Sequence, residues 1–378
     1  MIGSNTGDAG SSSTPTPDAN KDAKTAQTDE EQQKLNELIA QWSAMTFEDS
    51  EIPTLPQKVH SGEPEDLYYG LIGLRKALSR DSDPPIQVVI DSGVVPTLIE
   101  LIQSSSIPEI QLEAGWALTN LCSGTTEQTK ILINYGVIPG FISLVKSENS
   151  DIIEQGMWGL GNITGEGSEM IDLVLKSGGL EAMMEALEKS SEKTVKSVGI
   201  WVLSNFCKGK VMPAYERISK TIPVFCACLK NEEDEEILEN TAWALANIAK
   251  TKEGADSIFK ENICEDLVHL ISKLEVPQIR GGMQTIKNIL SHGNEVQASG
   301  FLQQNNFLTN LLKLADHKSK AIRMDLFSVL TQIVSGSSDQ AEIIMGNSLF
   351  IEKMVHAARK DSSKEVKTKA TRALVRST

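Results

Sequence analysis

Apolar residues recur along most of this chain at the spacing of an α-helix. From about residue 65 onwards, segments with apolar side chains at a period of about 3.6 residues follow one another. Short polar stretches such as "SG" at 92 and "NEED" at 231 separate them. No segment of useful length alternates apolar and polar residues as a half-buried strand does. The pattern therefore predicts an all-α fold.

One helical segment occurs four times in the chain. "GWALTN" begins at 115, "MWGLGN" at 157, "IWVLSN" at 200 and "AWALAN" at 242. The tryptophans of these copies, Trp116, Trp158, Trp201 and Trp243, lie 42, 43 and 42 residues apart. A second marker, in "SGVVP" at 92 and "YGVIP" at 135, has the same spacing. The chain is therefore built from internal repeats.

The repeat length indicates the architecture. A period of about 42 residues with three helical segments in each unit is that of HEAT and armadillo repeats. Weaker copies follow at 283 ("MQTIKNIL"), 326 ("LFSVLTQIV") and 368 ("TKATRALV"). We predict a right-handed α-solenoid of about eight armadillo repeats, the last one incomplete, whose long helices line a concave groove.

The N-terminal segment differs in composition from the repeats. It is rich in Ser, Thr, Asp, Gly and Pro, and residues 1–60 contain ten acidic residues, four lysines and no arginine. We expect residues 1–52 to form a disordered acidic tail. Within it, residues 29–45 form a candidate short amphipathic helix with Leu35, Leu38, Ile39 and Trp42 on one stripe. The solenoid is expected to cover residues 53–378.

The four repeated segments pair a tryptophan with an asparagine on one helical face. With Trp116 at the origin of a helical wheel, Asn120 lies about 40° away, whereas Leu118 and Leu121 lie about 200° and 140° away. The same offsets recur in the three other copies, whose core residues are then Gly159, Leu160, Ile163, Val202, Leu203, Phe206, Ala244, Leu245 and Ile248. The core face is complete without the tryptophans and asparagines.

This face suits the binding of an extended, basic peptide. An asparagine amide offers a donor and an acceptor together, so it can hold the main chain of a peptide without regard to its sequence. Indole rings on neighbouring repeats can border the methylene stem of a Lys or Arg side chain, whose charged head gains about 0.5–2 kcal/mol of cation–π attraction. The alternative is that each tryptophan packs between repeats and each asparagine satisfies a backbone group. Four pairs in one register favour a binding surface.

The residues around these pairs resemble importin-α (karyopherin-α), the adaptor family that binds nuclear localisation signals. "EAGWALTNLCSGTTEQTK", "EQGMWGLGNITGEGSE" and "WVLSNFCKGK" are similar to its second, third and fourth repeats. The resemblance covers about residues 53–275. It implies that the major signal-binding site consists of Trp116, Asn120, Trp158, Asn162, Trp201 and Asn205. It also implies that Gly124, Thr129 and Glu166 form the pocket for the most deeply bound lysine, and Gln155, Trp243 and Asn247 match the family pattern too.

The chain departs from the importin-α pattern at several positions. Glu166 stands where the family commonly has Asp, and Val198 where an Asn is usual. Asn288 is kept, but Gln284 replaces a usual Arg. The family's minor site has W-x-x-x-N in the seventh and eighth repeats, where this chain has Ser328, Gln332, Arg372 and Arg376. We therefore expect the minor site to be lost.

The resemblance also bears on the partners. The importin-β-binding arm of the family is rich in Arg and Lys, unlike residues 1–60 here, so importin-β is a doubtful partner. Basic nuclear localisation signals of cargo proteins are the expected ligands, in the cytoplasm and the nucleus. The expected function is that of a nuclear import signal receptor or adaptor. The alternative is a non-transport armadillo scaffold, or a retention or competitor factor, that binds other peptides.

Charge and cysteine content narrow the function further. The formal net charge of −15 disfavours direct binding to nucleic acid and favours a cationic partner. No apolar run is long enough to span a membrane, and the N-terminus lacks a secretory signal pattern. The five cysteines, Cys122, Cys207, Cys226, Cys228 and Cys264, are scattered and are expected to be buried, reduced thiols.

The sequence offers no candidate for catalysis. "GLGNITG" at 159 spaces its glycines loosely but follows no strand, so a phosphate-binding loop is disfavoured. The five histidines, His60, His269, His292, His317 and His356, form no metal-ligand or acid–base pattern. We expect no enzymatic activity, no cofactor and no metal site.

Overall fold

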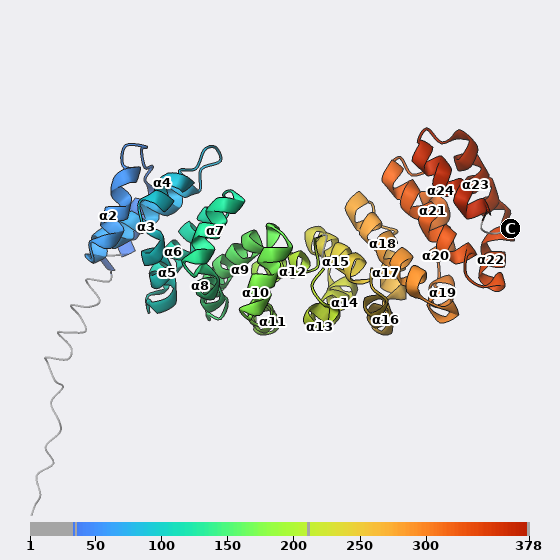
Figure 1. Cartoon of the computed structure of the whole chain (residues 1–378), viewed down its shortest axis with the longest axis horizontal. Helices are drawn as coiled ribbons and strands as arrows, with labels where there is room; N and C mark the ends of the chain where they lie inside the picture. The colour runs from blue at the N-terminus through green and yellow to red at the C-terminus, as the bar shows by residue number, and fades with distance from the viewer. Residues whose placement is uncertain (1–32, 35, 210–211, 376–378) are drawn as a thin grey trace, which may run out of the picture.

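The fold is all-α, as predicted. The computed structural model describes residues 33–34, 36–209 and 212–375. These residues contain 23 α-helices, α2 to α24, two short 3-10 helices and no strand. The helices follow one another as an elongated row of similar units (Figure 1).

The helices group into eight units, each ending in a long helix. Units one and two contain η1 (Ile52–Thr54), α2 (Leu55–His60) and α3 (Pro64–Leu78), then α4 (Ile86–Asp91), α5 (Val95–Ser104) and α6 (Pro108–Leu121). Units three and four contain α7 (Thr126–Asn134), α8 (Val137–Val145) and α9 (Ser150–Gly165), then α10 (Ser168–Lys176), α11 (Gly179–Lys189) and α12 (Lys193–Phe206).

The second half repeats this arrangement. Units five and six contain α13 (Tyr215–Ile218), η2 (Ser219–Thr221), α14 (Ile222–Asn231) and α15 (Glu235–Ile248), then α16 (Lys252–Lys260), α17 (Cys264–Leu270) and α18 (Val276–His292). Units seven and eight contain α19 (Glu295–Leu302), α20 (Phe307–Leu314) and α21 (Lys320–Val334), then α22 (Ser338–Met345), α23 (Ser348–Lys360) and α24 (Lys364–Val375).

The long helices stack on one another along the row. The helices α3, α6, α9, α12, α15, α18, α21 and α24 each contact the next one in this series. The prediction of about eight units is therefore confirmed. The eighth unit, expected to be incomplete, has all three of its helices in the described part of the chain.

A residue in the left-handed conformation precedes the second helix of most units. Gly93, Gly136 and Gly178 have φ values of 77°, 88° and 82°, at the positions marked by the second sequence repeat. Asn262 and Asn306, with φ values of 56° and 65°, occupy the corresponding places in units six and seven. Glycine and, less often, asparagine tolerate this conformation. Units six and seven thus keep the left-handed turn between their first two helices, although asparagine replaces glycine there.

The packed core begins before the first unit. Residues 36–44 are helical, and the buried Trp42 meets the ring of Tyr69 edge-on at 5.9 Å between centroids. Phe47 meets the same ring at 5.2 Å. The packed part of the chain thus begins within residues 1–52, which were predicted to form the disordered tail. The rest of that tail, residues 1–32 with Leu35, lies outside the described residues.

The core is one continuous apolar cluster along the solenoid. The five cysteines are buried within it and are not bonded to one another, as expected. Burial raises the pKa of the Cys207 and Cys226 thiols to about 12, so they stay protonated near neutral pH. Within the described residues, no helix is long and apolar enough to span a bilayer, and no three His, Cys, Asp or Glu side chains are grouped to hold a metal ion.

Close packing inside α9 can be tested with alanine substitutions. A Cβ on Gly159 would lie 2.3 Å from the buried ring of Phe141, whereas a Cβ on Gly165 would meet nothing within 4 Å. Gly159→Ala is expected to lower the free energy of unfolding by about 1–3 kcal/mol through overpacking. Gly165→Ala, the control, should raise it by up to about 1 kcal/mol through helix propensity. Denaturant unfolding measures both, and equal stability of the two variants would contradict the packing described here.

Candidate peptide-binding groove

The four Trp–Asn pairs lie on a different face of the long helices from the leucine-rich core face, but they are not equally exposed. Trp116 and Trp158 are 38 % and 40 % exposed, and Asn205 is buried. The other members are half-buried: Trp201, Trp243, Asn120, Asn162 and Asn247. On the core face, Leu118 and Leu121 are fully buried. The corresponding core residues of α9, α12 and α15 are buried as well. The helical-wheel prediction is thus confirmed for the core face. We call the four pairs the Trp–Asn row.

The asparagines of this row also link neighbouring units. Asn162 donates its Nδ2 to the carbonyl oxygen of Thr119 at 3.1 Å, and Asn205 donates to the carbonyl of Gly161 at 3.2 Å. Asn288, at the same position of unit six, donates to the carbonyl of Ala246 at 2.8 Å. Each of these bonds crosses to the long helix of the preceding unit. These asparagines therefore satisfy backbone groups, which is what the alternative to a peptide-binding surface predicts for them.

The amide oxygens of the row differ in their partners. Asn205 accepts a hydrogen bond from Lys208 Nζ at 2.9 Å, and Asn247 accepts one from Lys250 Nζ at 2.6 Å. Among the described residues, no donor reaches the Oδ1 atoms of Asn120 and Asn162. Asn120 instead donates its Nδ2 to the Ser79 hydroxyl at 2.8 Å. Units two and three therefore offer free, oriented acceptors.

An arginine covers a tryptophan at each end of the row. The guanidinium of Arg75 lies 4.8 Å from the centroid of Trp116, and its Nε is 2.5 Å from Glu113 Oε2. At the other end, the guanidinium of Arg280 lies 5.5 Å from the centroid of Trp243. The chain thus supplies its own cation–π partners to two of the four indoles.

The two central tryptophans are in contact with each other. The ring centroids of Trp158 and Trp201 are 4.9 Å apart and the planes are tilted by 43°. An alkyl stem between two ring faces needs planes about 7 Å apart, twice a normal carbon contact. A Lys stem would therefore enter between these rings only after Trp201 tilts away.

The backbone beside Trp201 explains where its ring rests. A Cβ on Gly161 would lie 2.0 Å from Cζ3 of Trp201. Only a residue without a side chain lets the ring lie this close to α9. Gly161 therefore sets the position of the Trp201 ring, a role that the sequence pattern did not indicate.

The expected lysine pocket is only partly open. Thr129 has no exposed surface, and its hydroxyl donates to the carbonyl of Cys122 at 3.3 Å. Glu166 is exposed and accepts a hydrogen bond from the Thr126 hydroxyl. Glu166 is thus the accessible carboxylate of the expected pocket. Gln155 is half-buried, and its carbonyl accepts from the Thr119 hydroxyl at 3.0 Å.

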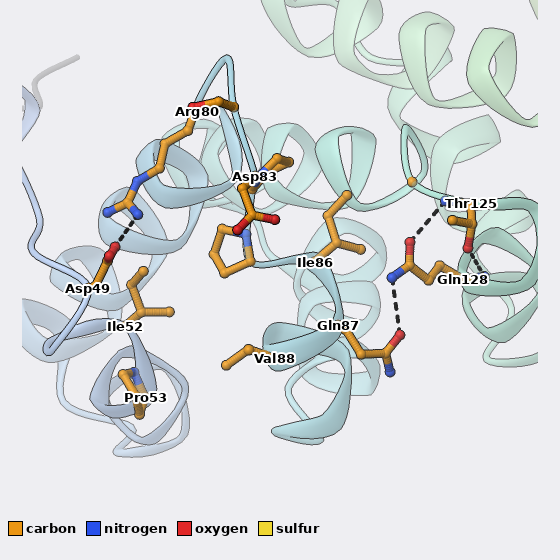
Figure 2. Close-up of a pocket in the computed structure, with 14 residues that line it drawn as sticks. Asp49, Ile52, Pro53, Arg80, Asp83, Ile86, Gln87, Val88, Thr125 and Gln128 are labelled. Atoms are coloured by element: carbon orange, nitrogen blue, oxygen red, sulfur yellow. Dashed lines mark hydrogen bonds and ion pairs between the residues drawn. The ribbon is translucent and has the colours of Figure 1, made fainter.

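Gly124 borders a cavity of about 1020 Å³ beside the first two units (Figure 2). The side chain of Gln128 lines the same cavity. Its Oε1 accepts from the Thr125 N–H at 2.9 Å, and its Nε2 donates to Gln87 Oε1 at 3.1 Å. A Cβ on Gly124 would lie 2.4 Å from the same Oε1. Gly124 therefore makes room for the cap of α7.

In units six to eight, the positions equivalent to the tryptophans carry Gln284, Ser328 and Arg372. Gln284 is half-buried and donates to Asp325 Oδ1 at 2.6 Å. Ser328 donates to the carbonyl of Met324 at 2.8 Å, and Arg372 is exposed. The second expected arginine, Arg376, lies outside the described residues. Val198, the other departure, is buried.

The comparisons with known proteins agree with the repeat architecture. A model of the Armadillo/beta-catenin-like repeat matches residues 82–123, 125–165 and 217–250. A crystal structure of an engineered protein has the same fold, with a TM-score of 0.78 at 24 % identity over 86 % of this chain and 78 % of that one. The chain is therefore an armadillo-repeat protein.

Sequence relatives point to one branch of these proteins. Importin subunit alpha-1a of Oryza sativa subsp. japonica is 30 % identical over 307 residues, which are 80 % of this chain and 58 % of the relative. Importin subunit alpha-5 of Arabidopsis thaliana is 38 % identical over 221 residues, which are 58 % of this chain and 42 % of the relative. The chain spans about half the length of these relatives. Over these residues it is similar to importin-α subunits.

The contact between Trp158 and Trp201 should be visible in the circular dichroism spectrum. Two close, tilted indoles couple their transitions and give a pair of bands of opposite sign. Gly161→Ala is expected to displace the Trp201 ring and to remove this couplet, as Trp201→Phe does. Trp116→Phe, the control, should leave it intact. A couplet that survives in Gly161→Ala would contradict the close packing of Trp201 against α9.

Proposed function

We propose that this chain is a nuclear import adaptor-like receptor that binds extended, Lys/Arg-rich nuclear localisation signals. The observation that carries the proposal is the pairing of exposed Trp116 and Trp158 with the oriented amides of Asn120 and Asn162. The similarity to importin-α subunits supports the same role. Such an adaptor meets its cargo in the cytoplasm and releases it in the nucleus.

The amides of units two and three would hold the peptide main chain. Because its Nδ2 is engaged with the Thr119 carbonyl, the amide of Asn162 has a fixed orientation, and its oxygen is left to accept a peptide N–H. Packed helices lie about 8–10 Å apart, which is the length of about three residues of extended chain. Asn120 and Asn162 would then bond to main-chain groups about three residues apart.

The side chains of the signal would be recognised by indole faces and a carboxylate. The exposed part of Trp158 would border a Lys or Arg stem, and Glu166, eight residues further on, caps the C-terminus of the same helix. An ammonium that reaches Glu166 gains a charge-assisted hydrogen bond. Glu113 contributes less, because Arg75 already neutralises it.

Units four and five would contribute more weakly to binding. Lys208 and Lys250 occupy the amide oxygens of Asn205 and Asn247, and their charge repels a basic peptide. Burial lowers the pKa of Lys208, with Glu239 acting in the opposite direction. The strongest contacts are therefore expected in units two and three.

A peptide titration tests the proposal. Fluorescence anisotropy of a labelled Lys-rich signal peptide should report saturable binding, and the Lys→Ala version of the peptide should bind at least about tenfold more weakly, since 1.4 kcal/mol is a factor of ten. Asn162→Ala should weaken binding by about three- to tenfold through loss of one hydrogen bond. Asn247→Ala, the matched control in unit five, should have a smaller effect. Equal binding of both peptides would reject a signal receptor.

The arginine over Trp116 generates a second prediction. Arg75→Gln uncovers the Trp116 ring and leaves the Glu113 carboxylate without its partner, so affinity for the Lys-rich peptide should rise several-fold. Arg217→Gln removes the same charge on α13, where Arg217 pairs with Asp172, and serves as the control. An equal change in the two variants would show that only net charge matters.

A further inference from the structure

The groove changes the sign of its charge along the solenoid. In units two and three, the positions around the row carry Glu113 and Glu166. In units five, six and eight they carry cationic residues, together with Glu239 in unit five, and unit seven carries Asp325 there. On a wheel with about 100° per residue, Lys287 on α18 and Lys369 and Arg372 on α24 lie within about 60° of the Trp position of their own helix. Lys250 lies two residues beyond the end of α15 and donates to Asn247 Oδ1.

These four cations have no carboxylate partner in the described part of the chain. The acidic residues near them are already engaged. Asp325 accepts from Arg280 Nε at 2.9 Å, Glu365 pairs with Lys320 at 2.9 Å, and Asp361 pairs with Arg323 at 2.7 Å. A protein with a net charge of −15 thus keeps four uncompensated positive side chains on one face.

The lysines also lie within each other's electric field. Lys287 is half-buried and donates to Gln284 Oε1 at 2.7 Å. Burial is the main cause that lowers its pKa, the charge of Asp325 opposes this, and the charges of Lys369 and Lys250 lower the pKa by smaller amounts. The positive charges of units five and eight therefore act on Lys287 in unit six.

The amides of the row continue into this half of the groove. Asn288 is buried and bonds to the Ala246 carbonyl, so it joins the units, whereas Gln332 is half-buried at the same position of unit seven. The Trp positions, by contrast, carry Gln284, Ser328 and Arg372. This surface therefore has an amide that can bond to a peptide main chain, but it has no indole ring against which a Lys stem could pack.

We propose that the concave face of units five to eight binds an extended acidic peptide segment of a partner protein. The half-buried amide of Gln332 holds its main chain, and Lys250, Lys287, Lys369 and Arg372 pair with its Asp and Glu side chains. The four long helices α15, α18, α21 and α24 span roughly 30 Å at the usual helix spacing, which fits about nine extended residues.

A peptide suits this face better than a nucleic acid does. Bases of a single strand need aromatic side chains on which to stack, and the Trp positions of units six to eight have none. The net charge of −15 also repels a long polyanion, whereas a short acidic segment meets only the local cations.

The test is the titration of a labelled peptide of about nine residues, made of Glu, Asp and Ser, with the full chain. Saturable binding that weakens with added salt is expected. Lys287→Gln and Lys369→Gln should each weaken it about threefold or more, while Lys369→Arg, which keeps the charge, should restore most of the affinity. Lys313→Gln on α20, away from this face, is the matched control and should leave the affinity unchanged. Equal thermal stability of the variants shows that folding is not the cause.

Three results would overturn the proposal. These are no binding of the acidic peptide, equal loss in Lys313→Gln and Lys287→Gln, or tighter binding of a single-stranded oligonucleotide than of the peptide through the same lysines. The Lys-rich peptide should not displace the acidic one, because it is expected in units two and three. The titration of the Lys-rich peptide and that of the acidic peptide therefore test the two proposals independently.

Discussion

The hydrogen bond from an asparagine amide to a main-chain carbonyl of the preceding long helix is the interaction on which this groove depends. It occurs from Asn162 to Thr119, from Asn205 to Gly161 and from Asn288 to Ala246. One side chain thus fixes the register of two neighbouring helices and its own orientation. Because the amide has a second functional atom, the half-buried Asn162 both joins two units and leaves an acceptor free, whereas Asn205 and Asn288 are buried.

The chain's own side chains then determine how much of this surface remains available. Arg75 and Arg280 cover the end indoles, the two central rings rest against each other, and Lys208 and Lys250 occupy two amide oxygens. Each of these contacts is one that a basic peptide would otherwise make. At most positions, a bound peptide must therefore replace a contact between two side chains of the protein with a contact of its own. Units two and three have the fewest such contacts to replace.

Charge distinguishes the two halves of the groove more sharply than shape does. The stacking of long helices continues through the described residues, so the positions that face the groove are equivalent from one unit to the next. Their residues change from Trp, Asn and Glu to Gln, Ser, Lys and Arg. A repeat architecture permits this change, since the core residues that hold each unit lie on the opposite face of the same helix.

The sequence by itself determined the all-α repeat fold, the unit length and the face of each long helix that stays out of the core. These features follow from periodicity, and periodicity is local. It also indicated the Trp–Asn row. It gave no sign that Arg75 would lie over Trp116, that Trp158 and Trp201 would touch, or that Thr129 would be fully buried. The two aromatic contacts join residues about 40 positions apart, on different helices, and their distances depend on how the units stack. Only the tertiary structure could decide them, because a helical wheel gives the direction of a side chain but not what stands opposite it.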